Sequence, residues 1–121
     1  MNAALNIWPW RSLGVDTRMQ ADFVEWFGLS STEARILEAL YLAKGWLTHK
    51  QLALISRPGG GSVGAVKNHI ANIREALDRG GIEQMSGLEG TRWYGNRLTE
   101  RGLTECDAAL NSMHGLVGEF D

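Results

Sequence analysis

Three helix-start signals in the middle of the chain limit what this sequence can fold into. "SSTE" is a capping box, in which the Ser30 hydroxyl and the Glu33 carboxylate each satisfy an orphan backbone amide. "THKQ" repeats the pattern, with Thr48 as the cap and Gln51 three residues later. "RPGGG" ends the second helix within about two turns, and Ser62 then caps a third helix. The sequence therefore predicts three consecutive helices joined by short connections.

The third helix has two sides of different composition. Its apolar stripe recurs at helical spacing and consists of Val66, Ile70, Ile73 and Leu77. The opposite side carries small residues, amides and one acid: Gly64, Asn68, Ala71, Asn72 and Glu75. An exposed helix face usually carries Glu, Lys and Arg, and Asn is a mediocre helix former. Helix propensity therefore does not explain this outer side.

Further elements are expected before and after these three helices. A helix can begin after Asp16 and stop at Gly28, with Met19, Phe23, Trp26 and Phe27 on one face; a strand over "DFVEW" is the alternative. Residues 83–88 and 92–98 suit two short strands separated by "EGT". A final amphipathic helix places Leu103, Cys106, Leu110 and Met113 on one side.

This order of elements is that of a winged helix-turn-helix. The predicted fold class is α+β, mostly α, with a three-helix core, a β-hairpin wing and a C-terminal helix. In such folds the third helix enters the major groove of DNA, and the hairpin lies against the backbone. We expect a tryptophan-rich N-terminal extension with one helix packed on the core (residues 1–28), a winged-helix domain (29–98), and a C-terminal helix and tail (99–121).

Three motifs resemble the OmpR/PhoB type of winged-helix DNA-binding domain. They are "LSSTEARILEAL" in the first helix, "VKNHIANIREAL" in the third, and "GG…M…EGTRWY" leading into the wing. They occur in the family's order and near its spacing over roughly half the chain, in a context that gives a motif weight. "RLTERG" after the wing also resembles the exit from the wing in MarR-type and PadR-type regulators, so the subfamily stays open.

The chain departs from the OmpR/PhoB pattern at three places. The residues before Leu29 are too few for the family's phosphoacceptor receiver domain and leading sheet, so a stand-alone domain is expected. The family's long loop between the second and third helices, which can touch RNA polymerase, is replaced by the short "SRPGGG". Glu89, Ala71 and Asn72 stand where basic residues are common in the family, which predicts a lower affinity for the DNA backbone.

The resemblance implies which residues contact DNA. It places Asn68 and Asn72 at positions that reach base edges, and helical geometry independently puts them one turn apart on the exposed side. An Asn carboxamide can form two hydrogen bonds with adenine. The residues expected at DNA phosphates are Arg57, Ser62, Lys67, Arg74, Thr91, Arg92 and Arg97. The alternative interpretation is that both asparagines simply face solvent.

Composition narrows the class of protein. With 121 residues, 44% hydrophobic and 21% charged, the chain suits one soluble globular domain. Its net charge of −2 neither favours nor opposes a nucleic-acid partner. The single cysteine, Cys106, excludes an intramolecular disulfide, fits a reducing cytoplasm and is expected in the core. No apolar run approaches the roughly 20 residues that span a bilayer, so a cytoplasmic protein without membrane contact is expected.

Neither a catalytic site nor a cofactor is predicted. His49, His69 and His114 lie in different elements without zinc-site spacing, and His69 is expected to pack or to form a hydrogen bond. "GGGSVGAVK" lacks the Gly-Lys-Ser/Thr ending of a phosphate loop. The acidic residues are spread over helix surfaces and form no general acid/base pair. We therefore expect no enzyme, no metal and no bound cofactor.

The predicted function is sequence-specific binding of double-stranded DNA by a small transcriptional regulator. Residues 62–78 would enter the major groove, and the wing, at about residues 83–98, would lie on the backbone. The alternative is a winged-helix protein–protein adaptor or antirepressor that does not bind DNA, which the acidic net charge and Glu89 favour.

Two apolar segments suggest protein partners. A homodimer through the amphipathic helix of residues 99–113, or through Trp8 and Trp10, is hypothesised because a single winged helix covers only a short site. Trp8 and Trp10 either tuck into the core in place of the family's leading sheet or form an aromatic patch for a protein partner.

Overall fold

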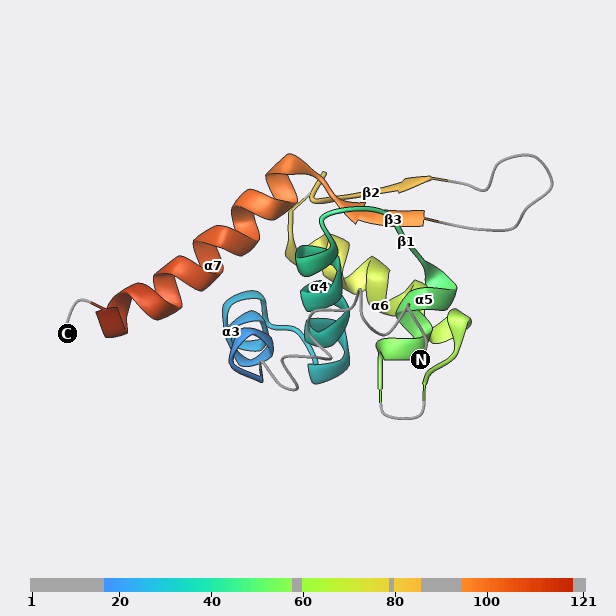
Figure 1. The fold of residues 1–121 in the computed structure, drawn as a ribbon, viewed down its shortest axis with the longest axis horizontal. Coiled ribbons are helices and arrows are strands. Elements are labelled where there is room, and N and C mark those ends of the chain that lie inside the picture. The colour runs from blue at the N-terminus through green and yellow to red at the C-terminus, as the bar shows by residue number, and fades with distance from the viewer. Residues whose placement is uncertain (1–16, 58–59, 79, 86–94, 119–121) are drawn as a thin grey trace, which may run out of the picture.

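The computed structural model describes residues 17–57, 60–78, 80–85 and 95–118, which form five helices and a three-stranded antiparallel sheet (Figure 1). In chain order the elements are α3 (Thr17–Phe27), α4 (Ser31–Ala43), β1 (Leu47–Thr48), α5 (His49–Ile55), α6 (Val63–Ala76), β2 (Ile82–Met85), β3 (Gly95–Leu98) and α7 (Glu100–Gly118). Helices α4, α5 and α6 form the three-helix core, and β2 and β3 form the hairpin. The predicted fold class is confirmed, and α3 is a helix, as predicted, rather than a strand.

The predicted caps begin the three core helices. Ser30 Oγ accepts from the Glu33 N–H at 3.2 Å, and Glu33 Oε1 accepts from the Ser30 N–H at 3.1 Å. Thr48 and Gln51 form the same reciprocal pair at 3.0 and 2.8 Å. The Ser62 hydroxyl caps α6. Because each cap satisfies amides that the helix itself leaves unpaired, local sequence determines where these helices begin.

The turn between α5 and α6 favours glycine at two positions. Gly60 has a φ of +90°, which L side chains rarely adopt. At Gly61 a Cβ atom would lie 2.4 Å from the Ser56 hydroxyl, because the Gly61 N–H donates to the Ala53 carbonyl at 2.6 Å. The chain thus passes close to the end of α5 before it enters α6.

The core lies where α4 packs against α3, α5 and α6. Its largest fully buried apolar side chains are Phe23, Ile36, Leu37, Leu40, Leu52, Val66, Ile70, Ile73 and Leu77. Phe23 brings α3 into this core and packs edge-on against Tyr41, which is only partly buried. Trp26, which the spacing places on the same face as Phe23, is 47% exposed. Helix α3 buries Asp22 and Phe23 instead, so the packed side does not include Trp26 in the last turn.

The sheet has the strand order β1-β3-β2, with β3 in the centre. Leu47 pairs with Asn96, and Ile82 pairs with Leu98, so these side chains point to the buried face. The hairpin strands cover only part of the predicted ranges 83–88 and 92–98, and residues 86–94 lie outside the described part of the chain. Strand β1 could not be predicted from the sequence, because a two-residue strand has no periodicity and forms through its pairing with β3.

Helix α7 leaves the sheet and packs against α3, beyond which it extends (Figure 1). Cys106 and Ala109 are fully buried on its packed side, which confirms the prediction for Cys106. Burial raises the pKa of the Cys106 thiol to about 12, so the thiol stays protonated. The side chain of Met113 lies outside the described residues. None of the helices in the described part of the chain is long and apolar enough to cross a membrane.

Candidate nucleic-acid interface

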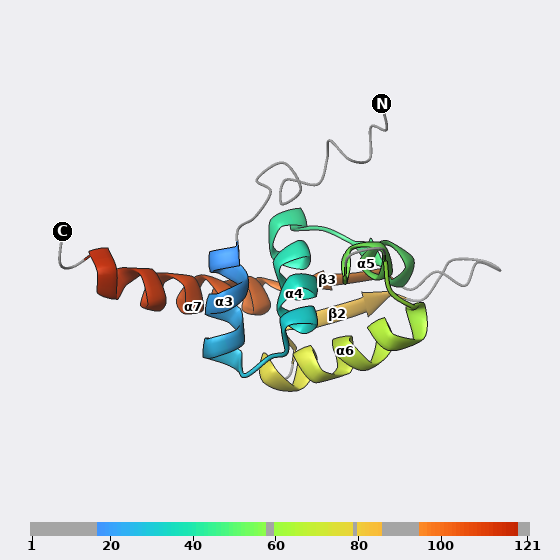
Figure 2. The same ribbon diagram turned by 90° about the horizontal axis from the view of Figure 1, so that it is seen from below.

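Helix α6 has one buried and one exposed side. The apolar stripe is confirmed, since Val66, Ile70, Ile73 and Leu77 are at most 1% exposed. The outer residues are all exposed: Gly64, Asn68, Ala71, Asn72 and Glu75. Figure 2 shows α6 along an edge of the molecule, where no described element covers this side. A convex helix with small side chains is thus free to approach a large partner.

One carboxylate at the start of α4 holds α6 in place. Glu33 Oε2 accepts a hydrogen bond from Asn72 Nδ2 at 2.8 Å and is 3.0 Å from His69 Nδ1. Because an ionised carboxylate can only accept, it sets the amide nitrogen of Asn72 towards α4 and requires the proton on Nδ1 of His69. The predicted hydrogen-bonding role of His69 is confirmed.

The environment of Glu33 favours its charged form. Burial is the largest single influence and by itself raises the pKa of this carboxyl. Hydrogen bonds from Asn72, His69 and Ser30 act in the opposite direction and together prevail, so the pKa of Glu33 lies below its ordinary value of 4.5. Glu33 is therefore ionised at neutral pH, and one charged group links the α4 cap to the exposed helix.

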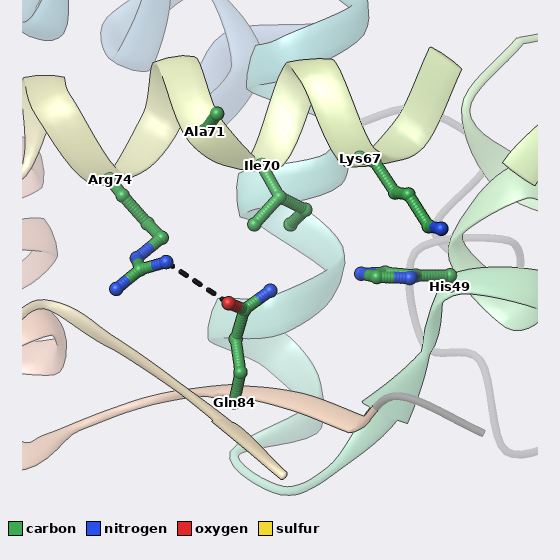
Figure 3. Close-up of a pocket in the computed structure, with 6 residues that line it drawn as sticks. All are labelled: His49, Lys67, Ile70, Ala71, Arg74 and Gln84. Atoms are coloured by element: carbon green, nitrogen blue, oxygen red, sulfur yellow. Dashed lines mark hydrogen bonds between the residues drawn. The ribbon is translucent and has the colours of Figure 1, made fainter. Parts of the chain in front are cut away.

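Asn68 and Asn72 differ in their surroundings. Asn72 is exposed but keeps one N–H on Glu33, which leaves its second N–H and its carbonyl oxygen available. Asn68 is also exposed, and its carboxamide forms no hydrogen bond with any of the described residues. Lys67 and Arg74 lie on the flank of α6 that faces the sheet (Figure 3).

A chain of polar side chains fixes Arg74 to the sheet. Arg74 Nη1 donates to Gln84 Oε1 at 3.0 Å, and Gln84 Nε2 donates to Asn96 Oδ1 at 2.9 Å. Asn96, which is fully buried, donates in turn to the Leu47 carbonyl at 3.3 Å. These hydrogen bonds run from Arg74 on α6 through β2 and β3 to β1, and they fix the orientation of the Arg74 guanidinium.

The other residues predicted at phosphates are scattered. Ser62 and Arg57 are exposed near the start of α6, and Arg57 Nε donates to the Gly60 carbonyl at 2.9 Å. Arg97 lies on the outer face of the sheet, where it pairs with Glu83 and stacks over the Trp46 ring, 4.6 Å from the ring centroid. The structure does not bring Arg97 together with the outer side of α6. Four other residues of the sequence predictions, Thr91, Arg92, Trp8 and Trp10, lie outside the described residues.

Three residues that organise this surface were not predicted from the sequence. Gln84 and Asn96 form the polar chain to Arg74, and His49 lies beside Lys67 (Figure 3). No local motif marks them, because their partners come from elements far apart in the sequence. Together with Ile70 and Ala71, the residues His49, Lys67, Arg74 and Gln84 line a pocket of about 320 Å³ between α6 and the sheet. Within the described residues no group of His, Cys, Asp and Glu could hold a metal ion.

Comparison with known proteins supports the fold. Neither a protein-family model nor a curated protein sequence matches the chain. The chain is similar in structure to MepR in a crystal structure of the S. aureus MepR–DNA complex, with a TM-score of 0.59 and 20% sequence identity. The match covers 91% of this chain and 88% of that one. This likeness, together with the element order, shows that the protein has a winged helix-turn-helix fold.

Proposed function

We propose that this protein is a winged-helix transcriptional regulator that binds duplex DNA, with α6 in the major groove and the β2–β3 hairpin against the backbone. The observation that carries the proposal is the exposed side of α6, where Gly64, Asn68 and Ala71 form a surface of small and amide side chains. An α-helix fits the major groove, and small side chains allow a close approach to base edges. The similarity of the fold to a protein solved as a DNA complex supports this placement.

Asn68 and Asn72 are the proposed base readers. Asn68 can donate to N7 and accept from the N6 amino group of adenine. Asn72 retains a donor and its acceptor after its bond to Glu33, so Glu33 would fix the orientation of its carboxamide. We therefore expect Asn68 to act by direct contact alone, whereas Asn72 also helps to position α6.

Phosphate contacts are assigned first to Lys67 and Arg74, which flank the reading surface. The Ser62 hydroxyl and the Arg57 guanidinium, both exposed near the start of α6, are further groups that can contact phosphates. Arg97 contributes less, because Glu83 offsets its charge. Phosphate contacts of this kind set the register and orientation of a protein on DNA and carry no sequence information directly.

Selection from a random duplex library with the purified protein tests the proposal. We expect an enriched motif. Asn68→Ala should weaken binding to it by about 1–3 kcal/mol and relax the choice at one base position. Lys67→Ala should weaken binding to all duplexes and lower the salt slope by about one unit. Unchanged affinity and base preference for Asn68→Ala would contradict the assignment of the reading helix.

A protein–protein adaptor is the second candidate function. It is favoured by Glu75 on the exposed side of α6, because a negative charge on this surface opposes binding to DNA. The same selection separates the two functions, because an adaptor enriches no duplex.

We also propose that the protein forms a homodimer. A dimer would place two reading helices on two half-sites. Light scattering of the protein, free and with a selected duplex, should show twice the monomer mass. A strict monomer in both states rules the dimer out.

A further inference from the structure

The pocket between α6 and the sheet has a lining that suits an anion. Among the described residues, its charged or ionisable side chains are Lys67 and Arg74 from α6 and His49 from α5, and none is a carboxylate (Figure 3). Lys67 and Arg74 are seven residues apart, which separates their backbones by about 10 Å along the helix. Ile70 lies between them and forms an apolar floor (Figure 3).

The side chain of Arg74 is held in position before any charged ligand binds. Its bond to Gln84 uses one guanidinium N–H and, through Asn96, ties the side chain to the buried face of the sheet. The guanidinium keeps further donors, which are suited to the oxygens of a phosphate. Holding such a group in advance reduces the rotamer freedom that binding would otherwise remove.

His49 is the least expected member of the pocket. The residue is 6% exposed, and its ring lies next to the Lys67 ammonium (Figure 3). Burial first, and the positive charge of Lys67 second, lower the pKa of His49, while the Asn96 side chain acts in the opposite direction. The groups that face the imidazole are therefore Lys67 on α6 and Asn96 on β3, with Arg74 at the far end of the pocket. The free protein thus keeps this imidazole neutral near neutral pH.

We propose that this pocket is an oxyanion site for the backbone of the bound duplex, in which Lys67 and a His49 that takes up a proton on binding hold one phosphate, while Arg74 at the far end of the pocket holds a second. The inference rests on the proposed function and adds His49 and a linked proton to it. An entering phosphate places negative charge opposite the imidazole and offsets the repulsion from Lys67. Protonation then becomes favourable, so DNA binding strengthens as the pH falls. The sign follows from a pKa that is lowered in the free protein and raised in the complex.

Fluorescence anisotropy with the selected duplex tests the linkage at about pH 6 and about pH 8, on either side of the ordinary histidine pKa. For the wild type we expect several-fold tighter binding at the lower pH. His49→Gln keeps a side chain of similar size with an N–H donor and should bind with little change between the two pH values, at an unchanged base preference. Lys67→Ala and Arg74→Ala should each weaken binding about tenfold, as expected for the loss of one charge-assisted contact.

Arg18→Ala is the control for charge, because Arg18 is exposed on α3 and does not line the pocket. An equal loss for Arg18→Ala and Arg74→Ala overturns the site, as does an unchanged pH dependence in His49→Gln. The enriched duplex motif would survive both results, so the proposed function and this inference fail separately.

NMR of the DNA-free protein with added inorganic phosphate tests the site without a duplex. We expect saturable shifts at His49 and Lys67, and in the wild type a change in the titration of the His49 ring. Shifts without any duplex binding would identify a free oxyanion as the ligand, in place of the DNA backbone. No saturable shift, together with unaltered DNA affinity of the pocket variants, overturns the proposal.

Discussion

The carboxylate of Glu33 is the most informative position to perturb, because it belongs to both the α4 cap and the α4–α6 contact. Glu33→Ala removes the acceptor for the Ser30 amide and the acceptor shared by Asn72 and His69. Glu33 itself is 7% exposed, so its carboxylate is largely shielded from bulk water, although its partners on α6 are not. The effect should therefore exceed that of a simple helix cap.

The magnitude follows from the three bonds. Loss of a capping interaction costs about 0.5–2 kcal/mol, and a hydrogen bond to a charged group contributes about 1.5–3 kcal/mol. Asn72 is exposed and His69 is partly exposed, so both regain water when Glu33 is removed, which reduces the cost. We expect Glu33→Ala to lower the free energy of unfolding by about 2–4 kcal/mol, and Glu33→Gln by less.

Urea denaturation followed by circular dichroism measures this change. Glu75→Ala is the matched control, because Glu75 is exposed on α6, and surface substitutions usually stay within about 0.5 kcal/mol. A loss below about 2 kcal/mol for Glu33→Ala would refute the reasoning, since the loss of a cap alone can cost that much. In duplex binding, Glu33→Gln should also reduce the base specificity assigned to Asn72. A Gln amide can both donate and accept, so it does not fix the orientation of the Asn72 carboxamide.

The pH dependence of Glu33 has a defined sign. Its pKa in the folded protein is lowered from 4.5, so its contribution is complete above that value and is lost as the pH falls through the lower folded pKa. The difference in unfolding free energy between the wild type and Glu33→Gln should therefore be largest above about pH 4.5 and shrink in acid. A difference that grows as the pH falls would contradict the assignment of an ionised Glu33.

Three further substitutions have expected outcomes. Gly64→Ala, where an added Cβ meets nothing within 4 Å, should raise thermal stability by about 0.5–1 kcal/mol and weaken duplex binding, since the methyl group lies on the reading surface. Gly102→Ala should destabilise the protein by at least about 1–3 kcal/mol in urea, because its Cβ would lie 2.1 Å from the Gly81 carbonyl. Tyr41→Phe removes the 2.5 Å bond to Asp107 and should cost about 0.5–1.5 kcal/mol. That bond raises the pKa of Tyr41 to about 12, and ultraviolet titration should show its ionisation near that pH, with the stabilisation lost as the pH rises.

Much of the fold could be predicted because its signals are local. Ser30, Thr48 and Ser62 mark where three helices begin, since the groups that each cap satisfies lie within three residues. The stripe that includes Val66 and Ile73 predicts the buried side of α6, since helical periodicity depends only on spacing along the chain. The same reasoning predicted that Asn68 and Asn72 would be exposed.

Tertiary structure decided what those exposed groups contact. Spacing along the chain places Trp26 on the same face of α3 as Phe23, but the packing of α3 against α4 and α7 buries Asp22 and leaves Trp26 exposed. Glu33 has the sequence signature of a cap, and its second role, as the acceptor for Asn72, exists only because α4 and α6 cross at that point. Such hydrogen bonds join residues far apart in the sequence, so no local pattern encodes them.

The candidate site divides in the same way. The sequence, together with its resemblance to a known family, predicted that α6 exposes amides and that Lys67 and Arg74 flank them. The fold alone decided that Arg74 is held by Gln84, that Arg97 faces away beside Glu83, and that His49 joins the pocket. Each of these contacts spans α6, the sheet or α5, and it forms only when the packing of the core brings those elements together.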